Sequence, residues 1–174
     1  MTDSTNTTNT SNTAIEPTDH RFPAAGRGTI VLDDVVDIAR PPAEVFDNLA
    51  DVSNDPVWQD GLIEARFTSA GPVMVGSTGV HVAKPFGRRV EVGWRLTAFE
   101  PNREMAWTFV SGPFTGGEGY RLEPTATGTR VTHWAVLRPH GLLRVLRPLI
   151  AGSFVTQSQT NMEAFRDLLE AGAG

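Results

Sequence analysis

The sequence predicts one α+β domain in which an antiparallel sheet of seven strands curves around a long C-terminal helix. Three observations predict this fold class. Extended runs separated by Gly, Pro and Asn turns fill the middle of the chain, as in successive hairpins. Aromatic residues recur at alternate positions of several runs, which gives the sheet one apolar face. The final segment, Leu142 to Ala171, has the spacing of an amphipathic helix suited to cover that face.

The composition allows one core and a short tail. The chain has 174 residues, of which 40% are hydrophobic. Residues 1–27 are predicted to form a disordered tail, because their Thr- and Asn-rich composition offers almost nothing to bury. Residues 28–174 then form the domain. We recognise neither a signal peptide nor a membrane-spanning segment, so we expect a cytoplasmic protein.

The elements follow one another in a simple order. The first strand covers Thr29 to Ala39, after which Pro41 and Pro42 favour the start of a short helix. Further helical turns are expected in Asp51 to Asp60, which mixes capping residues with a proline. A turn is expected at residues 85–87. The six remaining strands are expected at Leu62 to Ala70, Ser77 to Lys84, Arg88 to Phe99, Glu104 to Ser111, Gly117 to Glu123 and Thr129 to Arg138.

Period-two alternation assigns side chains to the two faces of the sheet. The inner face is predicted to hold Val90, Val92, Trp94 and Leu96, then Met105, Trp107 and Phe109, then Glu118, Tyr120 and Leu122. His81 is out of phase with Val80 and Val82, so we expect it on the outer face. Trp134 is out of phase with His133 and is expected to contribute to an outer apolar patch.

The C-terminal segment is predicted to be helical, and Pro148 should produce a kink or a fresh helix start after a lead-in at Leu142 to Arg147. One stripe of the main helix should face the sheet. It consists of Phe154, Ser158, Asn161, Met162, Phe165, Leu168 and Leu169.

This order of elements resembles the helix-grip fold of the START/Bet v 1-like superfamily, and the sequence is similar to its bacterial polyketide cyclase and lipid-transport (SRPBCC) branch. The resemblance extends from about Thr29 to the C terminus. It is carried by the helix entry from Ile38 to Phe46, the Pro56-Val57-Trp58 element, Phe99-Glu100-Pro101, the stretch from Gly119 to Pro124, and Gly128-Thr129-Arg130-Val131-Thr132. None of these segments is a catalytic signature.

The resemblance implies a deep internal hydrophobic cavity between sheet and helix that receives a lipid, polyketide or aromatic compound. Members of this superfamily include binders, carriers and some enzymes, and the fold does not decide between them. Binding or carrying a hydrophobic small molecule is our leading expectation, because the sequence supplies a cavity lining rather than a reactive constellation. The alternative is a polyketide cyclase/dehydratase. An interaction module that uses the outer sheet face is a third reading.

Three polar residues would carry acid/base chemistry in the alternative case: His133, Tyr120 and Glu118. His133 shares the parity of Val131, so it points inward if Val131 does. It could equally be a hydrogen-bonded histidine in the cavity wall. Desolvation could raise the pKa of Glu118, but the glycines before it favour a solvated position at a strand end.

The ligand-contacting set follows from the predicted inner face and helix stripe. It comprises Trp58, Phe67, Trp94, Met105, Trp107, Phe109, Tyr120, His133, Phe154, Ser158 and Met162. The same aromatic residues could instead form a closed core.

Other chemistries are disfavoured. The chain has no cysteine, and its histidines lack metal-binding spacing, so we expect neither a metal nor another cofactor. A net charge of −5 argues against nucleic acid as a partner. Arg138 to Arg147 is expected to form a lid against the cavity rim, and contact with an anionic membrane is the less favoured reading. We expect a monomer or a homodimer.

Overall fold

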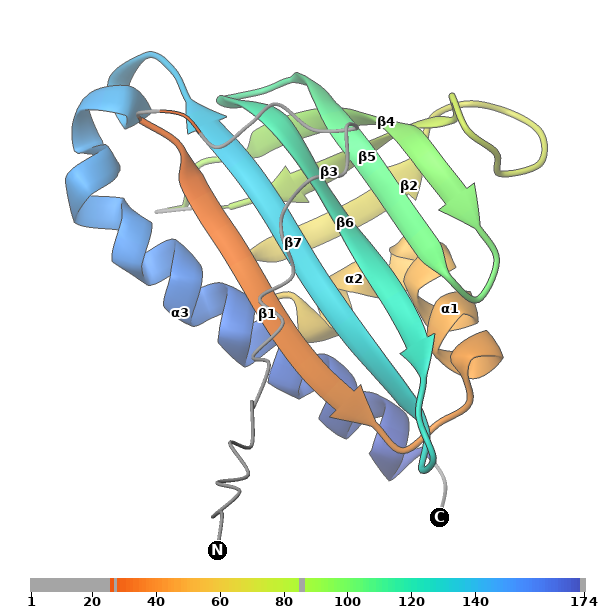
Figure 1. Cartoon of the computed structure of the whole chain (residues 1–174). Coiled ribbons are helices and arrows are strands. Elements are labelled where there is room, and N and C mark those ends of the chain that lie inside the picture. Colours follow the sequence, from red (N-terminus) through yellow and green to blue (C-terminus); the bar gives the residue numbers. More distant parts are fainter. Residues whose placement is uncertain (1–25, 27, 85–86, 173–174) are drawn as a thin grey trace, which may run out of the picture.

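The computed structural model describes residues 26, 28–84 and 87–172, and in these residues a seven-stranded antiparallel sheet wraps around one long helix (Figure 1). The strand order is β1-β7-β6-β5-β4-β3-β2, so each strand from β2 to β7 pairs with its neighbour in sequence and β7 also pairs with β1. The strands are β1 (Ile30–Ile38), β2 (Leu62–Phe67), β3 (Thr78–Ala83), β4 (Val90–Glu100), β5 (Glu104–Ser111), β6 (Phe114–Pro124) and β7 (Thr129–Pro139). The predicted fold class is confirmed.

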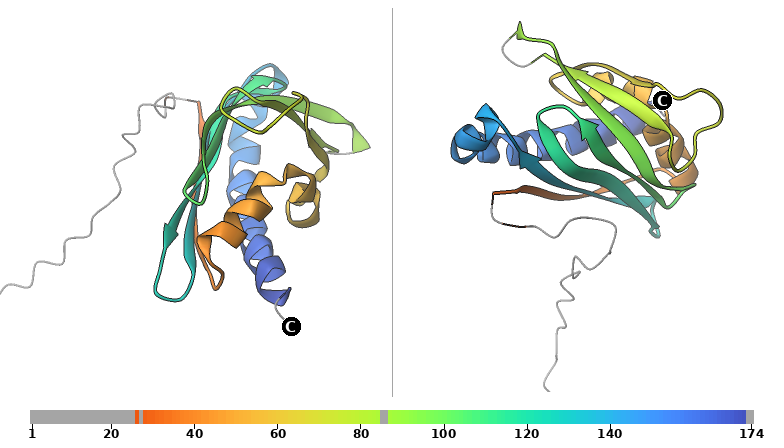
Figure 2. Two further views of the ribbon diagram at one scale, coloured as in Figure 1. Left: turned by 90° about the vertical axis from the view of Figure 1, so that its right-hand side faces the viewer. Right: turned by 90° about the horizontal axis from the view of Figure 1, so that it is seen from above.

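The helical elements lie on the concave side of the sheet (Figure 2). They are α1 (Pro42–Ala50), the 3₁₀ turn η1 (Val52–Asn54), α2 (Asp55–Trp58) and α3 (Leu142–Ala171). Pro42 begins α1, where its missing N–H costs no hydrogen bond. The Asp51 carboxylate accepts the backbone N–H of Ser53 and so caps η1. No helix among the described residues is long and apolar enough to cross a lipid bilayer.

The core forms between the concave face, α1, α2 and the C-terminal part of α3. Its large members include Trp94, Leu96, Met105, Trp107, Tyr120, Leu122 and, from α3, Met162 and Phe165. The predicted inward positions are therefore confirmed for these residues of β4, β5 and β6, whereas Val90 and Val92 are only half-buried and lie outside this core. Two β-bulges in the β4–β5 pair, at Gly93/Trp94 and at Leu96/Ala98, interrupt the alternation. After the second bulge Phe99 turns inward and its ring lies 5.3 Å from that of Phe46.

Several local expectations are corrected by the structure. Of the two alternatives expected at Pro148, a kink or a fresh helix start, the second is wrong: α3 continues through Pro148 as one element, which bends over its first turns (Figure 1). The glycine-rich stretch before Glu118 is not a loop, because β6 already begins at Phe114. Trp134 is on the outer face as expected but is only half-exposed, with its indole over Gly119.

The predicted outward position of His81 is also wrong. Its side chain is buried against Trp94 and Trp107 on the inner face. Val80 and Val82 occupy the opposite face of β3 and are nevertheless buried, Val82 completely. Val82 lies in register between Glu64 and Glu91, whose ion pairs with arginines cross this face. Because both faces of β3 are buried, its apolar residues do not distinguish the inner face from the outer one.

Two expectations fall on residues that the structure does not describe. The predicted tail, residues 1–27, lies outside the described residues except for Gly26, and so do residues 85 and 86 of the predicted turn at 85–87.

Candidate functional site

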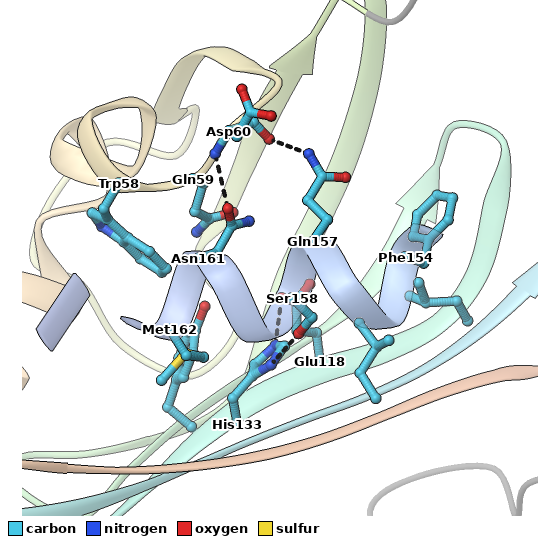
Figure 3. Close-up of a pocket in the computed structure, with 13 residues that line it drawn as sticks. Trp58, Gln59, Asp60, Glu118, His133, Phe154, Gln157, Ser158, Asn161 and Met162 are labelled. Carbon is cyan, nitrogen blue, oxygen red and sulfur yellow. Dashed lines mark hydrogen bonds and ion pairs between the residues drawn. The ribbon is translucent and has the colours of Figure 1, made fainter. Parts of the chain in front are cut away.

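A cavity of about 170 Å³ lies between α3 and the inner face of β1, β6 and β7 (Figure 3). Its walls combine apolar residues with a polar group of side chains. The lining residues are Leu32, Trp58, Gln59, Asp60, Glu118, Tyr120, His133, Leu137, Phe154, Gln157, Ser158, Asn161 and Met162. The predicted cavity is therefore present, but it is smaller than the range of about 300–1,000 Å³ usual for drug-sized ligands, and part of its wall is polar.

Strand register brings three polar side chains into one row. Asp34 on β1 lies directly opposite His133 on β7, and His133 lies directly opposite Tyr120 on β6. Residues opposite each other in an antiparallel sheet share a face, so the three side chains are neighbours on the concave side. Glu118 is two residues before Tyr120 on β6 and points to the same side.

His133 connects two carboxylates. Its Nδ1 atom lies 3.2 Å from Oδ2 of Asp34, and its Nε2 atom lies 2.9 Å from Oε1 of Glu118. The Ser158 hydroxyl on α3 donates a hydrogen bond to the Asp34 carboxylate and lies 3.1 Å from Nδ1 of His133. The helix thereby closes the cluster from the side opposite the sheet.

The cluster holds a charged imidazolium inside the protein. Burial alone lowers the pKa of His133, but hydrogen bonds to Asp34 and Glu118, and their charges, outweigh this effect and raise its pKa to about 9. Burial raises the pKa of Asp34, and its hydrogen bonds to His133 and Ser158 more than reverse that rise, so its pKa is lowered. At neutral pH the cluster is a carboxylate–imidazolium–carboxylate chain.

Tyr120 lies next to this cluster as a neutral phenol. Its ring stacks on the His133 ring with 5.0 Å between centroids and 30° between planes. Burial, then the charges of Glu118, Asp55 and Asp34, raise the pKa of Tyr120 well above 10. The Tyr120 oxygen therefore keeps its proton throughout the physiological pH range.

Two hydrogen bonds join the rim of the cavity to α3 (Figure 3). The backbone N–H of Asp60 donates to Oδ1 of Asn161 over 3.1 Å, and Nε2 of Gln157 donates to the Asp60 carbonyl over 2.8 Å. A second hollow of about 550 Å³ shares these three residues and continues outside along α3. The two hydrogen bonds of Asp60 thus lie between the cavity and this outer hollow.

A second histidine–carboxylate pair lies deeper in the core. Nε2 of His81 is 3.2 Å from Oδ2 of Asp55, an ion-pair distance without hydrogen-bond geometry. Burial raises the pKa of Asp55, although His81 acts in the opposite direction. Neither residue lines the cavity.

The structure divides the predicted ligand-contacting set into two groups. The lining of the cavity includes Trp58, Tyr120, His133, Phe154, Ser158 and Met162, together with Glu118. The core or its edge, away from the lining, holds Phe67, Trp94, Met105, Trp107 and Phe109. Trp94, Met105 and Trp107 are buried by neighbouring core residues, so they belong to the closed core and not to the cavity wall. As ligand contacts, the lining residues stay predictions.

Glu118 and the α3 lead-in differ from their expected settings. The Glu118 side chain is 19% exposed and bound to His133, not solvated at a strand end. Arg138 to Arg147 contributes nothing to the cavity lining, and Leu142 and Val145 are 72% and 74% exposed. A lid against the rim is therefore not formed by this segment.

Sequence reasoning missed Asp34 and four polar or charged lining positions. Asp34 had a usable signal, because it is the acidic residue among the inward positions of β1, with Ile30, Leu32, Val36 and Ile38. Gln59, Asp60 and Gln157 had none, since ordinary surface residues look the same. Asn161 was placed on the inner stripe of the helix without a role. Among the described residues, no group of three or more His, Cys, Asp or Glu side chains could hold a metal ion.

A comparison with protein-family models identifies the family of this chain. Residues 29–170 match the family model described as polyketide cyclase / dehydrase and lipid transport. The chain belongs to this family. The match covers nearly the whole described domain, including every strand of the sheet and the cavity residues.

Several solved structures share the fold of this polyketide cyclase/lipid-transport domain at low sequence identity. TTHA0849 from Thermus thermophilus is 13% identical, with a TM-score of 0.68 over 84% of this chain and 99% of that one. A START superfamily protein from Mycobacterium smegmatis is 12% identical, with a TM-score of 0.67 over 81% and 97%. The di-domain ARO/CYC StfQ from the steffimycin biosynthetic pathway is 12% identical, with a TM-score of 0.66 over 84% and 52%. Curated proteins give no match.

Proposed function

We propose that this protein binds or carries a small, largely apolar molecule in the cavity between the sheet and α3 and releases it unchanged. One observation carries the proposal: the cavity is built into the fold, while both nitrogens of the His133 ring are occupied by carboxylates. The apolar wall supplies binding energy by the area that it removes from water. The polar side chains supply orientation.

The protonation states of His133 and Tyr120 disfavour both residues as general bases. A general base works best when its pKa is near the operating pH and its basic atom is free. His133, with a pKa of about 9, is protonated at neutral pH. Tyr120 is an equally poor base because its phenol stays neutral, and burial and nearby carboxylates oppose its ionisation.

A cyclase/dehydratase-type activity is the second candidate, and Glu118 favours it. Glu118 both lines the cavity and contacts His133. Its carboxylate could accept a proton from a carbon next to a carbonyl, and the resulting enolate would attack a second carbonyl of the same substrate. The proton would return to the alkoxide so formed. The volume of about 170 Å³ restricts this chemistry to short substrates.

The test is to purify the protein natively, extract it with organic solvent and identify bound species by mass spectrometry. We expect a small apolar compound that raises the melting temperature when added back and is recovered unchanged. Catalytic turnover that Glu118→Gln abolishes, with the melting temperature retained, would instead establish the enzyme. Glu123→Gln is the matched control, because Glu123 is an exposed residue of the same strand.

A further inference from the structure

Negative charge is in excess at the cavity wall. Asp60 and Glu118 are its acidic members, and among the described lining residues there is neither lysine nor arginine. The cation at the wall is the His133 imidazolium, which lies between Asp34 and Glu118. Two carboxylates and one imidazolium leave a net charge of about −1 in this cluster at neutral pH.

The imidazolium has no free donor for a ligand anion. A charged imidazole carries two N–H donors, and those of His133 face Asp34 and Ser158 on one side and Glu118 on the other. The Ser158 hydroxyl donates to Asp34. A carboxylate entering the cavity would therefore meet Glu118 without a compensating cation, and burying a charge without a partner is costly.

Glu118 can still accept hydrogen bonds. An ionised carboxylate has about four acceptor positions on two oxygens, and the contact with His133 uses Oε1. A hydroxyl or amine on the ligand can fill a remaining position. Hydrogen bonds to an ionised acceptor are stronger than those between neutral groups.

The volume limits the ligand further. An apolar cavity of about 150 Å³ is known to hold benzene, so the present cavity of about 170 Å³ suits one six-membered ring. Trp58, Phe154 and Met162 provide apolar contacts for such a ring. A second fused ring would require side chains of the wall to move.

We infer that the cavity selects one-ring compounds, or chains of similar size, that carry a hydroxyl or amine donor and no negative charge. Phenols are the simplest members of this class. The inference rests on the proposed function and deepens it, because it names the chemical class that the same site accepts. It excludes carboxylates and phosphates from the cavity.

The experiment compares three ligands of similar size: phenol, toluene and benzoate. Dissociation constants are measured by titration near pH 7 with NMR detection of the indole N–H signals. We expect phenol to bind about tenfold or more tightly than toluene, because it adds a hydrogen bond to a carboxylate. Benzoate should bind more weakly than toluene.

The variant Glu118→Gln connects the preference to one residue. It should reduce the advantage of phenol over toluene and improve benzoate relative to toluene, since the negative acceptor becomes a neutral amide. Glu123→Gln, on the same strand but exposed, should change neither ratio. If Glu118→Gln does not fold, the order of the three ligands on the unaltered protein still decides the question.

The outcomes separate the two levels of the argument. Benzoate binding as tightly as phenol would overturn the inference and leave the proposed binding function intact. Equal dissociation constants for phenol and toluene would contradict the claim that a hydrogen-bond donor on the ligand strengthens binding. Binding of none of the three, with no ligand recovered by solvent extraction, would contradict the proposed function itself.

Discussion

Asp34 on β1 and His133 on β7 are direct cross-strand partners whose side chains meet inside the protein, with 3.2 Å between Oδ2 and Nδ1. Strand register alone places them together, and Ser158 of α3 then fixes the carboxylate from the opposite side. The polar row is thus a property of the sheet that the helix completes. Its stability and its charge state should respond together to substitution.

The first prediction concerns the pH dependence of unfolding. The pKa of His133 is about 9 in the folded protein and 6.5 in its ordinary state. Because the folded value is the higher one, the stabilisation is complete below about pH 6.5 and is lost as the pH rises through about 9. The free energy of unfolding should fall by up to about 3 kcal/mol between about pH 6 and pH 10.

Urea unfolding across this pH range measures the effect. His140→Gln is the control, because His140 is exposed and its replacement should leave the profile unchanged. His133→Gln should remove the steep alkaline decrease. A wild-type profile that is flat above about pH 7 would mean that His133 is not charged in the folded state.

The second prediction separates Asp34 from its neighbour Asp33. Asp34→Asn removes the carboxylate that helps to raise the pKa of His133, so that pKa should fall, and the protein should lose about 1–3 kcal/mol of stability. Asp33→Asn changes an exposed residue of the same strand and should have almost no effect. NMR titration of the His133 ring signals gives the pKa, and denaturant unfolding gives the stability. An unchanged pKa in Asp34→Asn would contradict the assigned partner.

The third prediction concerns ligand exchange through the rim. Gln157→Ala removes the hydrogen bond to the Asp60 carbonyl, and Asn161→Ala removes the bond to the Asp60 N–H. With either bond absent the connection to α3 loosens, so the dissociation rate of a bound phenol should rise several-fold. The cost in stability should be about 1 kcal/mol or less, because these bonds are near the surface.

NMR exchange spectroscopy measures the rate of phenol dissociation. Gln159→Ala is the matched control, since Gln159 is an exposed glutamine of the same helix. Equal rates in Gln157→Ala, Asn161→Ala and the control would show that ligands enter the cavity elsewhere.

The sequence predicted the fold well because alternation and helical spacing are local properties. Trp94, Trp107 and Tyr120 point inward as their parity requires. The same alternation on β1 indicates that the Asp34 side chain points inward. That Asp34 pairs with His133 follows only from the register between β1 and β7. That register depends on which strands meet, and no local pattern encodes it.

The failures have equally physical causes. Alternation gave the wrong face for His81, because both faces of β3 are buried. The bulge between Leu96 and Ala98 shifts the parity of β4 part-way along its length, and no residue pattern predicted it. The rim contacts of Asp60 join residues about a hundred positions apart, so they follow only from the docking of α3.

The last prediction uses two glycines with opposite surroundings. A Cβ atom at Gly79 would lie 2.0 Å from the Trp94 indole, which sits directly over this position. Gly79→Ala should therefore displace a fully buried tryptophan and destabilise the protein by about 1–3 kcal/mol, as expected for overpacking. A Cβ atom at Gly152 meets nothing within 4 Å, and Gly152 lies inside α3. Gly152→Ala should stabilise the protein by up to about 1 kcal/mol, because alanine favours the helix.

Denaturant unfolding of both variants, with tryptophan fluorescence as the probe, should give changes of opposite sign. A neutral Gly79→Ala would show that Trp94 can move aside without cost, and the cavity could then enlarge in that direction.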